Sequence, residues 1–145
     1  MRFLLFDRIT HLEPGKRIEG VKCVSMTEEF LRGHFDRAPC MPGSQVIEAM
    51  VQLTAWAAIA KHDYKLSCVL SMLDDVKVPA DIRPGTTIHI TGELMGTNPK
   101  GSFAKATATV DGEVVASIGR VLYAHVPMPD PDTLRERLSY FGYTP

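Results

Sequence analysis

Hydrophobic residues gather in one long block near the middle of the chain. The block covers residues 44–61 and leaves almost no polar face, because its apolar members are Val46, Ile47, Ala49, Met50, Val51, Leu53, Ala55, Trp56, Ala57, Ala58 and Ile59. Pro42-Gly43-Ser44 marks its start, and Lys61-His62 places positive or titratable charge at its end. The pattern predicts a helix from Ser44 to Lys61. A helix that is apolar all round must be buried on every side, so the rest of the chain must wrap it.

Short apolar or alternating segments on both sides of this helix predict the wrapper. We expect about six strands, near residues 3–9, 18–24, 69–78, 87–94, 103–110 and 113–123. Turn signals separate them, and Asp111-Gly112 is the strongest, because this pair tolerates the positive φ that a tight hairpin needs. The expected fold class is α+β, with a long central helix inside a curved antiparallel sheet.

The remaining segments predict smaller elements. Thr27-Glu28-Glu29 resembles the cap and first turn of a short helix. Beyond residue 126 the chain is rich in proline, and a short helix is expected at Thr133–Tyr140. We therefore expect one domain over residues 1–126 and a proline-rich tail over residues 127–145.

Composition narrows the function classes. The chain has 145 residues, and 45% hydrophobic with 23% charged residues is typical of a globular domain with its own core. A net charge of −1 argues against nucleic acid or an anionic membrane as a partner, because both need concentrated positive charge. The longest apolar stretch, 46–60, is shorter than the roughly 20 residues that span a bilayer. The N-terminus lacks the pattern of a secretory signal, so we expect a cytoplasmic protein.

The three cysteines indicate no metal site. Cys23, Cys40 and Cys68 are widely spaced and form no C-x-x-C pair, so free thiols in a reduced compartment are expected. Cys40 lies near the residues discussed next, but nothing in its surroundings indicates a nucleophile, and a packing role is favoured.

Three neighbouring features carry chemistry. His34 lies in a loop before the predicted helix, and Gly43 lies where the first backbone N–H groups have no helical partner. Glu48 lies in the first turns of an otherwise apolar helix, where burial disfavours the charged form of a carboxyl. A base near neutrality, a carboxylic acid and an anion site at a helix end are the parts needed for elimination next to a carbonyl.

The segment around these residues resembles a known family. The matching motifs are Gly33-His34-Phe35, Pro39, Met41-Pro42-Gly43, and Glu48-Ala49 with Gln52. Further matches are Asp7-Arg8, Glu13-Pro14-Gly15-Lys16-Arg17, Val78, Arg83-Pro84-Gly85 and Val110-Asp111-Gly112. Together they resemble the Z-type 3-hydroxyacyl-acyl carrier protein dehydratases of fatty acid synthesis, which have the hot dog fold. The likeness covers most of residues 3–125.

The resemblance assigns roles. His34 would be the catalytic base, Glu48 the catalytic acid, and the Gly43 amide would polarise the thioester carbonyl. Residues that line the substrate tunnel or support the catalytic groups would be Phe35, Met41, Pro42 and Gln52. Glu rather than Asp at position 48 favours the Z-type over the isomerising A-type.

The resemblance also implies partners. The substrate would arrive on the phosphopantetheine arm of acyl carrier protein, and no metal or bound organic cofactor is implied. In the family the two catalytic side chains meet across a dimer interface, so the chain would form a homodimer or a trimer of dimers.

Two departures from the family pattern leave alternatives open. Asp36, followed by Arg37, stands where the family usually has proline, and the tail beyond His125 has no match. A hot dog acyl thioesterase that uses Glu48 to activate water is one alternative. A catalytically silent partner subunit of a dehydratase heterodimer is another. Taken alone, His34 would be a structural loop histidine and Glu48 a buried carboxyl satisfied by backbone groups.

The other titratable side chains are expected at the surface. His11, His62, His89 and His125 are scattered singly along the chain and are expected to be solvated. The basic residues Arg37, Lys100 and Lys105 could meet an acidic carrier protein, but ordinary solvated charge is the favoured interpretation.

Overall fold

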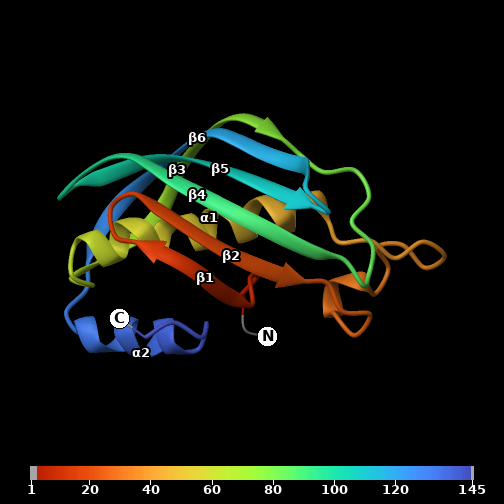
Figure 1. The fold of residues 1–145 in the computed structure, drawn as a ribbon, viewed down its shortest axis with the longest axis horizontal. Helices are drawn as coiled ribbons and strands as arrows, with labels where there is room; N and C mark the ends of the chain where they lie inside the picture. Colours follow the sequence, from red (N-terminus) through yellow and green to blue (C-terminus); the bar gives the residue numbers. More distant parts are fainter. Residues whose placement is uncertain (1–2, 145) are drawn as a thin grey trace.

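The computed structural model describes residues 3–144 and contains one long helix inside a six-stranded sheet (Figure 1). In chain order the elements are β1 (Arg8–Glu13), β2 (Arg17–Cys23), η1 (Glu29–Leu31), α1 (Gly43–Lys61), β3 (Leu66–Lys77), β4 (Thr87–Asn98), β5 (Gly101–Val110), β6 (Glu113–Pro127) and α2 (Pro131–Ser139). The helix expected from Ser44 begins one residue earlier, at Gly43, and ends at Lys61 as predicted. The predicted boundaries at Met1 and Pro145 lie outside the described residues.

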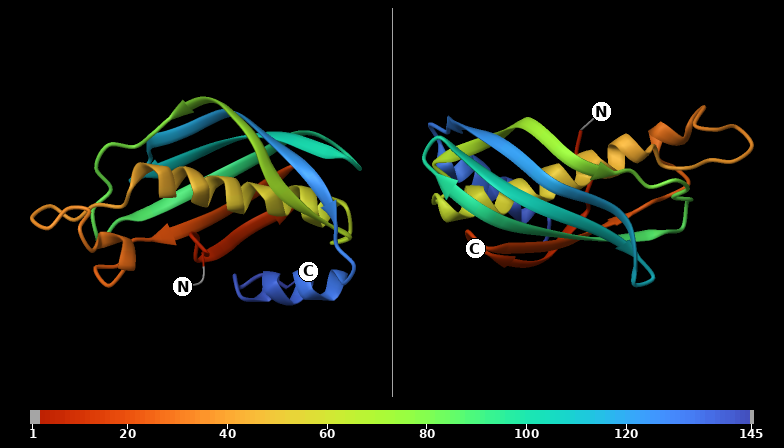
Figure 2. Two further views of the ribbon diagram at one scale, coloured as in Figure 1. Left: turned by 180° about the vertical axis from the view of Figure 1, so that it is seen from behind. Right: turned by 90° about the horizontal axis from the view of Figure 1, so that it is seen from above.

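The strands form one antiparallel sheet in the order β1-β2-β4-β5-β6-β3. The sheet curves around α1, which lies in its hollow (Figures 1 and 2). Small residues allow this close approach: Ala104, Ala106 and Ala108 on β5 are at most 2% exposed. This arrangement confirms the predicted α+β hot dog fold.

The central helix is buried as its composition requires. Thirteen of its residues are buried, from Val46 to Ala60. The phenol of Tyr123, on β6, donates a hydrogen bond of 2.7 Å to the carbonyl oxygen of Val51. Burial raises the pKa of Tyr123 well above its ordinary value, so this phenol stays protonated and remains a donor.

The N-terminal strand differs from its prediction. Residues 3–7 belong to no strand, and β1 spans Arg8–Glu13 instead of the predicted residues 3–9. Leu5 and Phe6 are buried, but the Leu5 N–H donates to the side chain of Gln52 on α1. The apolar run therefore reflects packing against the helix and not membership of the sheet.

The other element boundaries moved less. β3 begins at Leu66, before the predicted residue 69, and β4 and β6 extend to Asn98 and Pro127. The short helix expected after Thr27 is a single 3-10 turn, η1, and Glu28 stands at its N-terminus without a side-chain cap bond.

The proline-rich tail folds back on the core. The α2 helix is capped by Asp130, whose carboxylate accepts from the backbone N–H of Asp132. Leu134, Leu138 and Phe141 are buried, and the ring of Phe141 lies 4.1 Å from that of Phe6. The helix lies beyond β1 (Figure 2), and the ring of Phe141 lies 6.1 Å from that of Trp56 on α1. The division of the chain at residue 126 stays a prediction.

The last strand of the order, β3, has an exposed outer edge. Among residues 3–144 it pairs only with β6, and its side chains include exposed apolar residues: Val69, Leu70 and Met72. Such an edge offers unpaired backbone groups to a further strand.

Within residues 3–144, no helix is long and apolar enough to cross a bilayer.

Candidate functional site

His34 lies in the loop between η1 and α1, which projects from one end of the molecule (Figures 1 and 2). Its ring Nδ1 is 2.9 Å from the carbonyl oxygen of Cys40. A carbonyl only accepts, so Nδ1 carries the hydrogen, and in the neutral ring the lone pair is then on Nε2. The backbone closes the same loop, because the Cys40 N–H donates to the His34 carbonyl at 2.9 Å. The loop thus presents a half-buried imidazole in the tautomer that a general base needs.

The residues predicted beside His34 have different environments. Phe35 is exposed and its ring stacks on the imidazole, with centroids 4.4 Å apart. Met41 is buried, and its N–H donates to Ile82 at 2.7 Å. Pro42 stands at the N-terminus of α1 in an extended conformation. Met41 and Pro42 therefore fix the start of α1, whereas Phe35 presents an apolar ring next to the His34 imidazole.

Gly43 begins α1 in a very tight contact. A Cβ atom on this residue would lie 2.3 Å from Cγ1 of Val78 and 3.0 Å from the carbonyl oxygen of Pro79. Within residues 3–144 its N–H makes no hydrogen bond. A free N–H at a helix N-terminus, on the positive end of the helix dipole, suits a developing negative charge.

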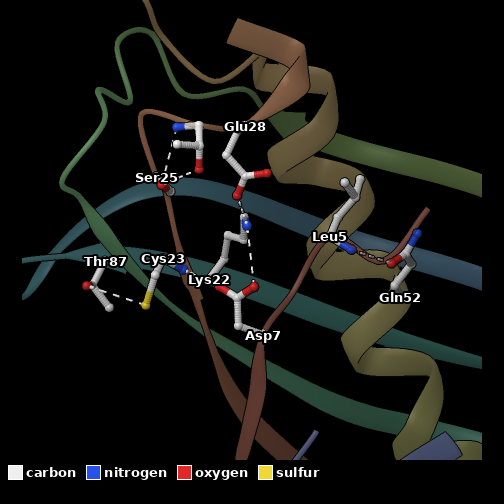
Figure 3. Close-up of polar contacts among 9 residues, drawn as sticks. Leu5, Asp7, Lys22, Cys23, Ser25, Glu28, Gln52 and Thr87 are labelled. Atoms are coloured by element: carbon white, nitrogen blue, oxygen red, sulfur yellow. Dashed lines mark hydrogen bonds and ion pairs between the residues drawn. The ribbon is translucent and has the colours of Figure 1, made fainter. Parts of the chain in front are cut away.

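Glu48 is half-buried on α1 and is held by Gln52 one turn later. The Gln52 Nε2 donates to the Glu48 carboxylate at 3.0 Å and to the Phe3 carbonyl oxygen at 3.2 Å. The Gln52 Oε1 accepts from the Leu5 N–H at 3.1 Å (Figure 3). Backbone groups on both sides therefore fix which way the Gln52 amide points. One carboxylate oxygen of Glu48 is thereby positioned.

A buried lysine that the sequence did not single out anchors the same region. Lys22 on β2 is 4% exposed, and its Nζ contacts the carboxylates of Glu28 and, at 3.4 Å, Asp7 (Figure 3). Glu28 leads into η1, and the η1 residue Leu31 accepts the His34 N–H at 3.3 Å. The ion pair thus ties the His34 loop to the sheet. Lysine is rarely buried, and no local pattern in the sequence marks this position.

His34 and Glu48 make no hydrogen bond to each other within residues 3–144: the ring of His34 bonds to Cys40 and Glu48 bonds to Gln52. Across the same residues, no cluster of three His, Cys, Asp or Glu side chains is arranged to hold a metal ion. One chain therefore positions the His34 imidazole and the Glu48 carboxyl separately, without joining them.

Two predictions for residues outside the site were wrong. His62 and His125 are half-buried and not freely solvated, with ring centroids 5.2 Å apart, and they bond to Thr97 and Ser102 respectively. They lie apart in the sequence, so only the pairing of β6 beside the end of α1 brings them together. By contrast Cys40 is buried beside His34, in keeping with a packing role.

Comparison with known families matches the FabA-like domain over residues 1–119. The 3-hydroxyacyl-(acyl-carrier-protein) dehydratase FabZ of Caldicellulosiruptor saccharolyticus is 41% identical over 123 residues, covering 84% of this chain and 87% of that protein. The enzyme of the same name from Bacillus subtilis is 38% identical over 117 residues, covering 80% and 83%. The family resemblance inferred from the motifs is confirmed.

Solved structures agree on the fold. The dehydratase heterocomplex ApeI:P from Xenorhabdus doucetiae matches with a TM-score of 0.71 at 16% identity, over 91% of this chain and 89% of that one. The protein smu.793 from Streptococcus mutans, solved with acetyl CoA, matches with a TM-score of 0.64 at 12% identity, over 85% and 90%. At these identities the likeness establishes the hot dog fold alone.

Proposed function

This chain belongs to the FabA-like domain family, and we propose that it dehydrates (3R)-3-hydroxyacyl thioesters on acyl carrier protein to trans-2-enoyl thioesters in fatty acid biosynthesis. The relatives named above carry this activity in their names and align with most of the chain. The contacts of the individual site residues add support that does not depend on the family match.

The base is the role with the strongest support. The 2.9 Å contact from the His34 Nδ1 to the Cys40 carbonyl leaves Nε2 as the atom that removes the α proton. As the C–H bond breaks, charge develops on the thioester oxygen, where the free N–H of Gly43 and the helix dipole stabilise it. Glu48, in its protonated form, then donates a proton to the departing hydroxyl, which leaves as water.

A dimer completes the site in this proposal. His34 and Glu48 do not bond within one chain, and the exposed edge of β3 carries an apolar row suited to a second copy. We propose a homodimer in which β3 pairs with its counterpart and each site takes His34 from one subunit and Glu48 from the other. Association of three dimers stays a prediction from the family.

The reaction needs little beyond these groups. The substrate's phosphopantetheine arm brings the thioester to the site, so acyl carrier protein is the proposed partner. The three free cysteines fit a reducing compartment such as the cytoplasm.

The test is a dehydration assay on 3-hydroxyacyl-acyl carrier protein, with the enoyl product measured by mass spectrometry. We expect His34→Ala and Glu48→Gln each to lower kcat by about 100-fold or more, the usual contribution of a general acid or base. Arg32→Ala, an exposed position in the same loop, is the control and should change kcat little.

The same assay separates the alternatives. Release of free thiol without enoyl product would identify a thioesterase. A folded wild-type protein that binds the carrier but forms no product would identify a silent partner subunit. Activity close to wild type in either catalytic variant would contradict the roles assigned to these side chains.

A further inference from the structure

The segment that follows α2 contacts residues from the opposite end of the chain. The ring of Phe141 lies 4.1 Å from that of Phe6, measured between centroids, and 6.1 Å from that of Trp56 on α1. All three side chains are at most 6% exposed. The Phe141 carbonyl oxygen also accepts a hydrogen bond of 2.9 Å from the N–H of Ile9 on β1. Phe141 therefore holds the N-terminal segment against the central helix.

The segment that Phe141 holds is the one that contacts Gln52. Leu5, which precedes Phe6, donates its N–H to the Gln52 Oε1 at 3.1 Å. The Phe3 carbonyl oxygen accepts from the Gln52 Nε2 at 3.2 Å. The residues before β1 belong to no strand, so their path over α1 depends on side-chain packing, to which the contact between Phe6 and Phe141 contributes.

The Gln52 amide passes this orientation on to Glu48. The two polar atoms of a glutamine side chain have opposite roles, since the oxygen accepts and the nitrogen donates. The Leu5 N–H needs the oxygen and the Phe3 carbonyl needs the nitrogen, so the backbone fixes the amide in one orientation. In that orientation Nε2 also donates to the Glu48 carboxylate at 3.0 Å. A displaced N-terminal segment would leave the amide, and with it the carboxylate, free to turn.

We propose that Phe141 is a positioning residue for the Glu48 carboxyl, and that it acts through residues 3–7 and Gln52. The proposal rests on the dehydratase function above, in which Glu48 gives a proton to the departing hydroxyl. Such a transfer requires the donor within hydrogen-bond reach of the leaving oxygen, so a small displacement lowers the rate. The FabA-like match ends at residue 119, so the tail supports, from outside that match, a carboxyl that lies within it.

The test is a double-mutant cycle on the dehydration of 3-hydroxyacyl-acyl carrier protein. We expect Gln52→Ala and Phe141→Ala each to lower kcat about tenfold, with KM changed less than about twofold. The double variant should also lose about tenfold rather than the product of about 100-fold, because both changes remove the same restraint on Glu48.

Two further variants show whether the aromatic contact is responsible. Phe141→Leu keeps an apolar side chain at the same place and should retain at least about half of the wild-type kcat. Phe6→Ala removes the other ring of the same contact and should reproduce the effect of Phe141→Ala. In combination with Gln52→Ala it should again add no further loss, so this second cycle remains usable if Phe141→Ala lowers the yield of folded protein.

Trp56 provides a signal for the docking of the tail that is separate from activity. It is the only tryptophan of the chain, and it is 6% exposed beside Phe141. Loss of the Phe141 ring should admit water and shift the Trp56 fluorescence emission to longer wavelength. Gln52→Ala leaves that ring in place, so it should lower kcat without this shift.

Ile118→Ala is the matched control. Ile118 is buried on β6 at 1% exposure, so its truncation also leaves a cavity and lowers stability. Its aliphatic side chain makes neither the ring contacts nor the hydrogen bonds that hold Gln52. Any effect of Ile118→Ala on kcat should therefore multiply with that of Gln52→Ala.

Losses that multiply in the Phe141→Ala, Gln52→Ala double variant would overturn the positioning role and leave Phe141 with a structural one. A Phe141→Ala protein that shifts the Trp56 emission yet keeps the wild-type kcat, or that raises only KM, would overturn it too. These results leave the dehydratase function standing. No enoyl product from the wild type would overturn that function, and the positioning role with it.

Discussion

At the scale of single residues, Lys22 connects the sheet through charge to the loop that carries His34. Its ammonium group is buried, whereas its partners Asp7 and Glu28 are partly exposed. The pair therefore holds η1 against β2 at the base of the loop that carries His34. Both carboxylates retain access to water. Without the lysine they would therefore destabilise the fold less than unpaired, fully buried charges would.

We predict that Lys22→Met lowers the free energy of unfolding by about 1–3 kcal/mol, since it removes hydrogen bonds to charged groups. It should also lower kcat more than it raises KM, because a looser loop misplaces the base. Urea denaturation and steady-state kinetics measure the two effects, with Lys65→Met at an exposed position as the control. Equal stability and kinetics in both variants would show that the ion pair has no positioning role.

A second prediction concerns His125. Burial, followed by the nearby His62, lowers the pKa of His125 below its ordinary value of 6.5, and its Nδ1 has no partner among the residues described. The unfolded chain therefore binds a proton more readily than the folded one, so stability is lost as the pH falls below 6.5. Hydrogen bonding to the backbone at Asn98 and Pro99 acts on the pKa of His125 in the opposite direction.

The expected result is a decrease of a few degrees in Tm between about pH 7.5 and about pH 5.5. Calorimetry of the wild type and His125→Gln measures it, since the variant should lose part of this dependence. An identical Tm profile in the two proteins would contradict the assignment.

At this scale the sequence indicated which residues belong to the candidate site better than it indicated their hydrogen-bond partners. His34 and Glu48 were found because a long motif surrounds them, and Gln52 because it follows Glu48 by one turn. The bonds from Gln52 to Phe3 and Leu5 could not be predicted, because they depend on how the N-terminal segment crosses α1. Lys22 was missed since nothing local marks its burial.

At the scale of elements, the start of α1 depends on how closely it packs. Gly43 touches the segment between β3 and β4, where a Cβ would lie within 2.3 Å of Val78. Glycine is needed here because a side chain would not fit. The helical backbone conformation at this position would by itself allow another residue.

We predict that Gly43→Ala costs about 1–3 kcal/mol of stability, as expected for overpacking, and shifts the N–H for which we propose an interaction with the thioester oxygen. Activity should fall more steeply than the folded fraction. Thermal unfolding and kcat measure this, with Ser44→Ala at the neighbouring exposed position as the control. Retention of full activity by Gly43→Ala would contradict a role for this amide.

The elements themselves were predicted to different degrees. The Asp111-Gly112 hairpin and the α1 helix follow from local chemistry, and both were confirmed. The first strand was placed five residues too early, because Leu5 and Phe6 are apolar for contact with the helix. The apolar signal reports burial, and it does not say whether sheet or helix provides it.

At the scale of the whole molecule, the proposed dimer makes a quantitative prediction. His34→Ala and Glu48→Ala homodimers should each be inactive. In a mixed dimer one site loses both groups and the other keeps both. Random exchange of subunits should therefore restore about a quarter of wild-type activity, as the symmetry of a dimer requires.

Subunit exchange can be driven by mild denaturant, followed by refolding and assay. No recovery of activity in a mixture shown by native mass spectrometry to contain mixed dimers would contradict shared sites. The His34→Ala protein alone, taken through the same denaturation and refolding, is the control.

The global arrangement was the least predictable part. The number of strands and the buried helix could be derived from periodicity, yet the order β1-β2-β4-β5-β6-β3 could not. Pairing of β3 with β6 depends on contacts between residues such as Leu66 and Pro127, far apart in the sequence. The position of α2 beside α1 had no signal beyond the apolar spacing of Leu134 and Leu138.

The pairing of β3 with β6 also has a consequence for synthesis on the ribosome. β3 ends at Lys77, but its partner strand begins only at Glu113. At about 5–20 residues per second, the nascent strand waits several seconds for its neighbour. During that interval Val69, Leu70 and Met72 have neither partner strand nor second subunit. A slower translation rate after residue 77 would lengthen the exposure of these apolar side chains.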